Sequence, residues 1–193
     1  TALIILPLLL LVLFKGGHAL FVLLLLVVNG LALWEFLGMF TPDADTFRRL
    51  KAIILGSVLL VSFCTAQRVT TLCNPSGPLF VLVAILFVLF LFYLIAYSHI
   101  PDLSRDLMVN LLGLLYIPLL LGHFVWLRYL SDGQWWVFWL LMVIMAGDTG
   151  AFYAGRTWGK TKLYPEVSPG KTWAGVAGGL AAAVIAGAVV GWY

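Results

Sequence analysis

Long apolar runs make up most of this chain, and short polar segments separate them. Seven runs are candidate helices, at residues 1–14, 19–40, 50–69, 79–97, 107–127, 134–153 and from about 171 to the end. A helix needs about 20 mostly apolar residues to cross a bilayer. The pattern therefore predicts an all-α fold, a polytopic transmembrane helix bundle with about seven helices, the first of them short.

The composition agrees with a membrane protein. Of the 193 residues, 63% are hydrophobic and only 10% are charged, whereas a soluble domain carries about 25% charged residues. The mean hydropathy is +1.09. So few charges argue against a nucleic-acid-binding protein, which needs a dense basic face. We expect one integral-membrane domain over residues 1–193. Because the sequence begins and ends in apolar runs and lacks an initiator Met, we expect this domain to be truncated.

Basic residues are concentrated in alternate connecting segments. If the first helix starts in the cytoplasm, eight Lys and Arg residues lie on the cytoplasmic side, namely Arg48, Arg49, Lys51, Arg105, Arg156, Lys160, Lys162 and Lys171. The opposite side then carries three, namely Lys15, Arg68 and Arg128. Cytoplasmic loops of membrane proteins are enriched in Lys and Arg. We therefore expect the basic loop at about residues 154–171 to face the cytoplasm.

The last apolar run consists largely of small residues. Gly175 and Gly179 form one Gly-x-x-x-Gly pattern, and Gly187 and Gly191 form another. Small residues on one helix face allow a second helix to approach closely. The pattern favours tight packing inside the fold, and the alternative is a homodimer face.

Asp148 is the first candidate functional residue, because it lies near the end of the sixth apolar run and is followed by Thr149 and Gly150. A charged side chain at the centre of a membrane helix costs about 2.5–3.5 kcal/mol on insertion scales, so such residues are usually functional. A carboxylate suits Mg2+, which binds through one or two carboxylates and substrate phosphates. The alternative is an ordinary solvated charge at a helix end.

The segment from Ser168 to Thr172 contains Gly-Lys-Thr. It is not a Walker A motif, because Pro165 stands where that motif requires glycine. Phosphate binding is still chemically reasonable, since Ser168 can cap the following helix and Lys171 supplies a point charge near the helix start. The alternative is a basic loop that only sets the topology.

Three further acidic residues have an interpretation of their own. Glu35, near the end of the second run, is either an interfacial side chain or an intramembrane partner for a cation or a lipid headgroup. Asp102 and Asp106 are interpreted as helix-start residues, where a negative charge is favourable.

The segment from Gly147 to Leu180 resembles the bacterial phosphatidate cytidylyltransferases (CDP-diacylglycerol synthases). Residues 148–152 are similar to the family pattern Asp-(Ser/Thr)-Gly-Ala-Tyr. Residues 155–163 are similar to Gly-Lys/Arg-x-x-Gly-Lys-x-Lys-Leu, and residues 168–175 to Ser-Pro-x-Lys-Thr-Trp-Glu-Gly. The chain departs from the family at Ala174, where Glu or Gln is usual, and it lacks the acidic C-terminal signature. The resemblance thus implies the N-terminal portion of such an enzyme, inactive alone.

The resemblance implies a reaction in which CTP and phosphatidate give CDP-diacylglycerol and pyrophosphate, with Mg2+ as cofactor. It implies that Asp148 helps to hold the metal and that Lys171 acts in catalysis. The residues that it implies for the CTP phosphates are Ser168, Gly170, Lys171, Thr172, Arg156, Lys160 and Lys162. The expected location is a bacterial inner membrane, with membrane lipid around the protein and the site facing the cytoplasm. The competing interpretations are a membrane transporter, a non-catalytic membrane subunit, and a lipid or polyprenol kinase.

Overall fold

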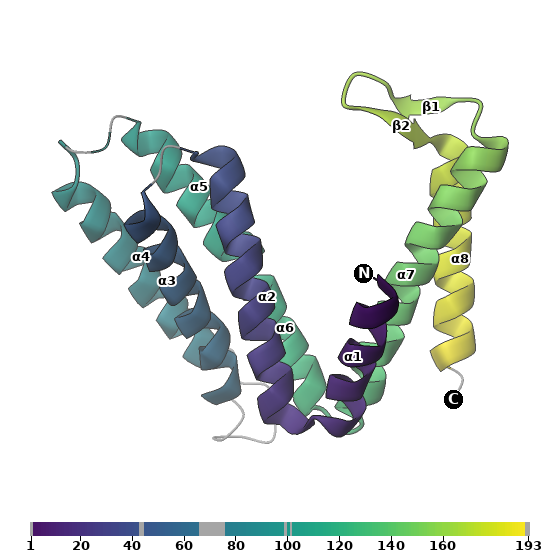
Figure 1. The fold of residues 1–193 in the computed structure, drawn as a ribbon, viewed down its shortest axis with the longest axis horizontal. Helices are drawn as coiled ribbons and strands as arrows, with labels where there is room; N and C mark the ends of the chain where they lie inside the picture. Colours follow the sequence, from purple (N-terminus) through teal and green to yellow (C-terminus); the bar gives the residue numbers. More distant parts are fainter. Residues whose placement is uncertain (1, 43–44, 66–75, 99, 101, 192–193) are drawn as a thin grey trace. The chain divides into compact units, whose positions relative to one another are not determined.

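The computed structural model describes the whole chain except residues 1, 43–44, 66–75, 99, 101 and 192–193. The described residues form eight helices and one two-stranded sheet (Figure 1). They divide into two compact units, Thr1–Ser131 with α1–α6 and Asp132–Tyr193 with α7, β1, β2 and α8. The helices and strands are α1 (Ala2–Lys15), α2 (Gly17–Phe40), α3 (Thr46–Thr65), α4 (Ser76–Ile95), α5 (Leu103–Tyr116), α6 (Pro118–Tyr129), α7 (Gly133–Trp158), β1 (Lys162–Tyr164), β2 (Ser168–Thr172) and α8 (Trp173–Gly191).

The prediction of an all-α membrane bundle is confirmed. Five helical segments are long and apolar enough to cross a membrane, namely Gly17–Phe40, Ser76–Ile95, Leu103–Tyr129, Gly133–Trp158 and Trp173–Gly191. The structure describes two further helices between or before them, α1 with 14 residues and α3 with 20. The prediction of a single domain over residues 1–193 stays a prediction, and each unit is described here by itself.

The prediction of about seven helices is confirmed when Leu103–Tyr129 is taken as one segment. This segment, which corresponds to the fifth apolar run, has a break that divides it into α5 and α6. α5 ends at Tyr116 and α6 begins at Pro118. Proline has no backbone N–H to donate, so it interrupts the hydrogen-bond ladder of a helix and is favoured in the first turn of the next. Ile117 bridges the break, since its N–H donates to the Gly113 carbonyl and its own carbonyl accepts from Leu121.

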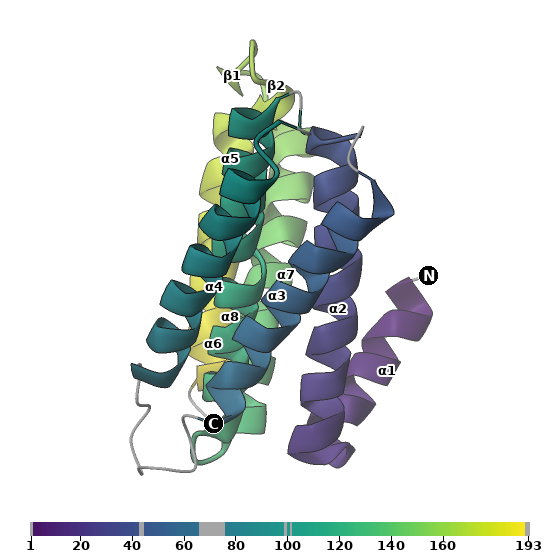
Figure 2. The same cartoon turned by 90° about the vertical axis from the view of Figure 1, so that its left-hand side faces the viewer.

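α3 is the central helix of the first unit and contacts α2, α4, α5 and α6, which run alongside it (Figure 2). α2 contributes a buried stripe with one residue on each turn, Phe21, Leu25, Asn29, Leu33 and Leu37. α3 contributes Leu59, Leu60 and Phe63, each at most 1% exposed. The core therefore comes from regularly spaced residues on helices that are apolar on almost every side.

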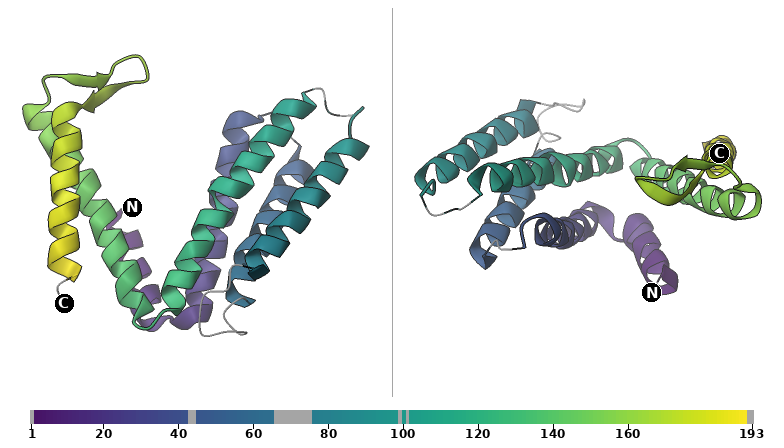
Figure 3. Two further views of the ribbon diagram at one scale, coloured as in Figure 1. Left: turned by 180° about the vertical axis from the view of Figure 1, so that it is seen from behind. Right: turned by 90° about the horizontal axis from the view of Figure 1, so that it is seen from above.

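The second unit consists of α7 and α8, packed against each other with the β1–β2 hairpin between them in sequence (Figure 3). Glycines lie at the contact. A Cβ atom on Gly175 would stand 3.0 Å from the Ala151 carbonyl oxygen, and one on Gly179 would stand 3.0 Å from the Gly147 carbonyl oxygen. The prediction of tight packing inside the fold is thus confirmed, while a homodimer stays a prediction.

The basic loop predicted at about residues 154–171 is mostly regular structure. α7 continues to Trp158, five residues beyond the predicted end at Tyr153, and the remaining residues include β1 and β2. The strands are antiparallel, with Lys162 opposite Thr172 and Tyr164 opposite Ser168, and an irregularity lies between these pairs. The Gly and Pro residues in this segment therefore mark turns and a bulge rather than an unstructured loop.

Candidate functional site

All predicted site residues lie in the second unit, on α7, on the hairpin or between them. Thr172 is the best-connected of them, with 5% of its surface exposed. Its hydroxyl oxygen accepts a hydrogen bond of 3.1 Å from the Gly175 amide. Gly155 and Gly159, which belong to the motif at residues 155–163, leave space for this hydroxyl group. A Cβ atom would stand 3.2 Å from the Thr172 Oγ1 if placed on Gly155 and 2.7 Å from it if placed on Gly159. Two of the three sequence motifs therefore meet at this residue.

The bond from Gly175 makes Thr172 the N-cap of α8, since a side chain that precedes a helix commonly accepts from the third helical amide. The expectation that Ser168 caps this helix was wrong, because Ser168 lies four residues earlier, in β2 opposite Tyr164. The first amide of α8, that of Trp173, donates to the Thr161 carbonyl oxygen over 3.1 Å. Two of the first three amides are thus bonded within the protein, which weakens the case for an anion held by the bare helix start.

The four basic side chains of the motif are all exposed, namely those of Arg156, Lys160, Lys162 and Lys171. Within the described part of the chain, none of the four forms an ion pair. Arg156 lies in the last turn of α7, where a positive charge is favourable because of the helix dipole. Gly170, next to Lys171, has no atom within 4 Å of where its Cβ would stand, so the backbone is open there. These cations are available to a multiply charged anion.

Asp148 lies deeper than its predicted position near the helix end. It precedes the last residue of α7 by ten residues, which corresponds to about 15 Å along the helix axis. The neighbouring Gly147 is level with Gly179 of α8, six residues or about 9 Å beyond the first residue of that helix. The side chain of Asp148 is exposed, and no described residue forms an ion pair with it. A carboxylate at this depth needs a polar or cationic partner.

Asp148 fits Mg2+ as one protein ligand, since this ion often keeps several waters and substrate phosphates as its other ligands. No group of three or more His, Cys, Asp or Glu side chains that could hold a metal occurs among the described residues. A complete metal cage is therefore not built from the described residues alone, and the Mg2+ prediction stays a prediction.

The structure also has a buried polar network that the sequence did not predict. Asp106 is only 4% exposed. Its Oδ2 atom accepts hydrogen bonds from the Tyr93 hydroxyl at 2.7 Å and from Arg48 Nη1 at 3.3 Å. Arg48 also pairs with Asp45, and the backbone amide and guanidinium of Arg48 lower the pKa of the Asp45 carboxyl. This network joins α3, α4 and α5.

The helix-start interpretation of Asp106 is compatible with this network, because Asp106 lies in the first turn of α5. The other members of the network lie within or just before apolar runs, since Tyr93 is in the fourth run and Arg48 precedes the third, and the sequence does not show that they meet. Lys51 adds to the same end of the unit, with its ammonium 3.5 Å from the centroid of the Phe92 ring. The network is a structural feature of the first unit, and no predicted site residue belongs to it.

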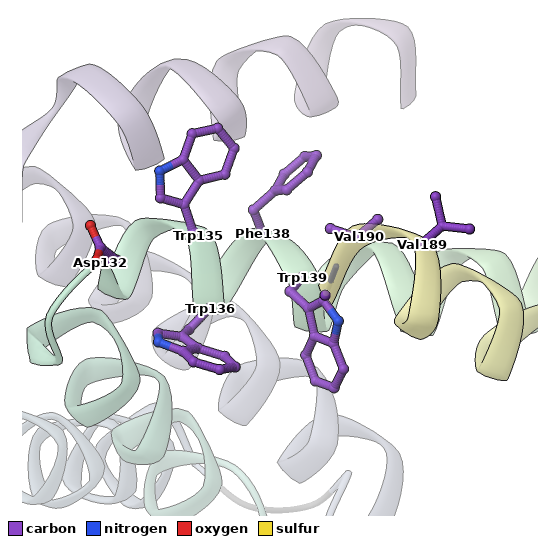
Figure 4. A pocket seen from close by; sticks show the side chains of 8 residues that line it. Asp132, Trp135, Trp136, Phe138, Trp139, Val189 and Val190 are labelled. Carbon is purple, nitrogen blue, oxygen red and sulfur yellow. The ribbon is translucent and has the colours of Figure 1, made fainter. Parts of the chain in front are cut away.

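The second unit also has a pocket at its other end, away from the hairpin, and aromatic and apolar side chains make up most of its lining. It lies between the start of α7 and the end of α8, so none of the motif residues lines it (Figure 4). Trp139 fixes the two helices here, since its Nε1 donates to the Gly187 carbonyl oxygen at 2.9 Å. Three tryptophans are among the residues that line the pocket, which are Asp132, Trp135, Trp136, Phe138, Trp139, Val189, Val190 and Gly191.

Comparison with known proteins decides the family. A family model described as "Cytidylyltransferase family" matches residues 1–193. The chain belongs to this family. Three similar proteins, each named "Phosphatidate cytidylyltransferase", come from Bacillus subtilis, Haemophilus influenzae and Rickettsia conorii. The identities are 39% over 75 residues, 45% over 53 residues and 31% over 135 residues, which is 38%, 28% and 69% of this chain.

These matches cover only part of the relatives. They account for 28%, 18% and 54% of the three proteins, in the same order, so the chain spans about half of the relatives' length or less. Membership of the cytidylyltransferase family agrees with the resemblance read from residues 147–180. It agrees as well with a helical integral membrane protein, given the five apolar helical segments.

Proposed function

We propose that the protein transfers a cytidylyl group from CTP to phosphatidate, which gives CDP-diacylglycerol and pyrophosphate. The observation that carries this proposal is the family match over the whole chain, together with a three-part motif that folds into one helix–hairpin–helix unit. The relatives' printed name supports the same pair of substrates. In this reaction an oxygen of the phosphatidate phosphate forms a bond to the α-phosphorus of CTP, and the bond from that phosphorus to the β-phosphate oxygen breaks.

The residues of the motif suit a reaction that depends on charge neutralisation. Phosphoryl-type transfers need positioning and electrostatic stabilisation more than covalent catalysis. Lys171 is exposed beside the open backbone of Gly170, and both are suited to approach the CTP phosphates. Arg156, Lys160 and Lys162 add positive charge around the same hairpin. Ser168 offers a hydroxyl group, while Thr172 holds the start of α8 and thereby fixes the position of Lys171.

Asp148 is the residue of this chain that would hold Mg2+. When bound, the ion would neutralise phosphate charge during the transfer. Asp148 would supply one carboxylate ligand from α7, and its depth of about 9 Å beyond the start of α8 suits a substrate that remains in the membrane. The cations of the hairpin lie nearer to water, where a soluble nucleotide arrives. We further propose that this end of the unit faces the cytoplasm of a bacterial inner membrane.

The first experiment is an assay of the full-length protein in mixed micelles of detergent and phosphatidate. It measures CDP-diacylglycerol formation with Mg2+ and with CTP, ATP, GTP or UTP, for wild type, Asp148→Asn, Lys171→Ala and Asp132→Asn. Asp132 precedes the opposite end of α7 and is the matched control. We expect CTP-specific product and, for Asp148→Asn, a loss of about a hundredfold or more, since a metal supplies several kcal/mol. Lys171→Ala should lose roughly tenfold to a hundredfold, the value of a charged hydrogen bond.

The outcome also separates the competing functions. Unchanged turnover in Asp148→Asn or Lys171→Ala would remove these residues from the site. No product with any nucleotide, in a folded preparation, would favour a transporter or a non-catalytic subunit. Phosphorylation of a lipid alcohol with ATP or GTP would favour a lipid kinase. Asp132→Asn should behave as wild type in every case.

A further inference from the structure

The β1–β2 hairpin is held at the level where two membrane-crossing helices end. α7 ends at Trp158 and α8 begins at Trp173, and both indole rings are exposed, at 74% and 58%. Tryptophan is enriched at the boundary between lipid and water. The Trp173 amide donates to the Thr161 carbonyl oxygen, so the base of the hairpin is fastened to the first residue of α8. The hairpin therefore cannot extend far from the boundary.

The strands run across the ends of α7 and α8 rather than along their axes (Figures 1 and 3). A hairpin that leaves two spanning helices sideways lies roughly parallel to the bilayer plane. Its tip is a tight turn, in which the Val167 amide donates to the Tyr164 carbonyl oxygen over 3.3 Å.

Apolar and cationic side chains are exposed on different parts of the hairpin, and the acidic Glu166 is exposed at its tip. At the tip, Val167 is 75% exposed and Tyr164 is 55% exposed. Nearer the base, the exposed side chains of Lys160, Lys162 and Lys171 carry positive charge. Apolar and aromatic groups next to cations are the chemistry that binds the interface of an anionic membrane, because the first enter the acyl boundary and the second meet lipid phosphates.

We propose that the hairpin is a membrane-interface element, which lies in the headgroup layer with Tyr164 and Val167 in contact with lipid. Two observations favour the bilayer as the partner. The exposed cations complement anionic lipid phosphates, and the hairpin connects two helices that can span the membrane. In this position the motif cations lie at the height of the lipid phosphates. The inference depends on the membrane placement of α7 and α8 and not on cytidylyl transfer.

The test measures how deep the tip lies. Single spin labels are placed at Val167→Cys, Tyr164→Cys and Glu166→Cys, each in a variant with Cys64→Ser and Cys73→Ser. The full-length protein is reconstituted in vesicles of equal parts phosphatidylcholine and phosphatidylglycerol. Collisions of each label with oxygen, which concentrates in lipid, are compared with collisions with a water-soluble nickel chelate. Glu166 lies at the same tip with a charged side chain, so it is the matched control.

We expect the ratio of oxygen to nickel collisions to be several-fold higher at position 167, at position 164 or at both than at position 166. High nickel access at both apolar positions would overturn the proposal, because the tip would then be in water. Shielding of both from oxygen and nickel would also overturn it, because the tip would then be packed against protein. Since no turnover is measured, a failed cytidylyltransferase assay leaves this result unaffected.

Discussion

The hydroxyl group of Thr172 holds the first turn of α8 through its bond to the Gly175 amide. Replacement of an N-cap threonine by alanine costs about 1 kcal/mol. We therefore expect Thr172→Ala to lower the apparent melting temperature of the protein in detergent micelles. Thr172→Ser should melt close to the wild-type temperature, because serine keeps the hydroxyl group.

Ser168→Ala is the control for this prediction, because Ser168 lies in β2 and does not cap α8. It should leave the melting temperature close to that of wild type. If Thr172→Ala melts as wild type does but binds CTP more weakly, the hydroxyl group of Thr172 serves the nucleotide rather than the helix, and the capping role is wrong.

Single residues were the least predictable part of this protein. A threonine after Gly-Lys has two uses, and the sequence could not decide between a phosphate ligand and a cap. The hydrogen bond to Gly175 shows the cap and leaves the phosphate role untested. Asp106 was predicted only as a helix-start residue, because its partners Tyr93 and Arg48 are 13 and 58 residues away along the chain. Such contacts depend on how helices pack, which local patterns do not encode.

The contact between α7 and α8 depends on glycines that leave no space for a methyl group. A Cβ atom on Gly178 would overlap the Ala154 Cβ and would stand 3.0 Å from the Gly150 carbonyl oxygen. Added atoms in a packed contact cost about 1–3 kcal/mol. We expect Gly178→Ala to lower the apparent melting temperature clearly and to reduce turnover, because it forces the two halves of the motif apart.

The same helix provides the control. A Cβ atom on Gly187 would meet Val143 at 3.5 Å and Trp139 at 3.6 Å, which is ordinary contact, so Gly187→Ala should be tolerated. The double variant Gly178→Ala, Ala154→Gly removes the nearest overlapping atom and should recover part of the loss. Equal effects of Gly178→Ala and Gly187→Ala would mean that helix propensity, and not close packing, decides stability here.

At the scale of elements, the sequence predicted most helices because hydrophobic length alone identifies a membrane span. It missed the break at Pro118, because the apolar run continues through it without a polar residue. It also predicted a loop where β1 and β2 lie. Three-residue and five-residue strands with Gly and Pro carry no usable alternation, so their pairing is visible only in the structure.

The whole molecule has a charge distribution that should fix its orientation in the membrane. In the first unit, Arg48 bonds to Asp106, so the start of α3 and the start of α5 lie at one end. At the other end Arg128 is only 8% exposed and its Nη2 donates to the Leu13 carbonyl oxygen near the end of α1. Arg128 therefore acts as a structural contact, and the end opposite Arg48 carries even less loop charge than the sequence count indicates.

Because basic residues are retained on the cytoplasmic side, we expect the hairpin to face the cytoplasm and the α6–α7 connection to face outward. Ser131→Cys and Glu166→Cys, each with Cys64→Ser and Cys73→Ser, place one thiol beyond each end of α7. In intact cells a membrane-impermeant maleimide should label Ser131→Cys, while Glu166→Cys should react only after permeabilisation. The reverse pattern would put the basic hairpin outside, where CTP is absent, and would contradict both the orientation and the proposed reaction. A folded preparation in which both thiols react only after permeabilisation would instead contradict α7 as a membrane-crossing helix.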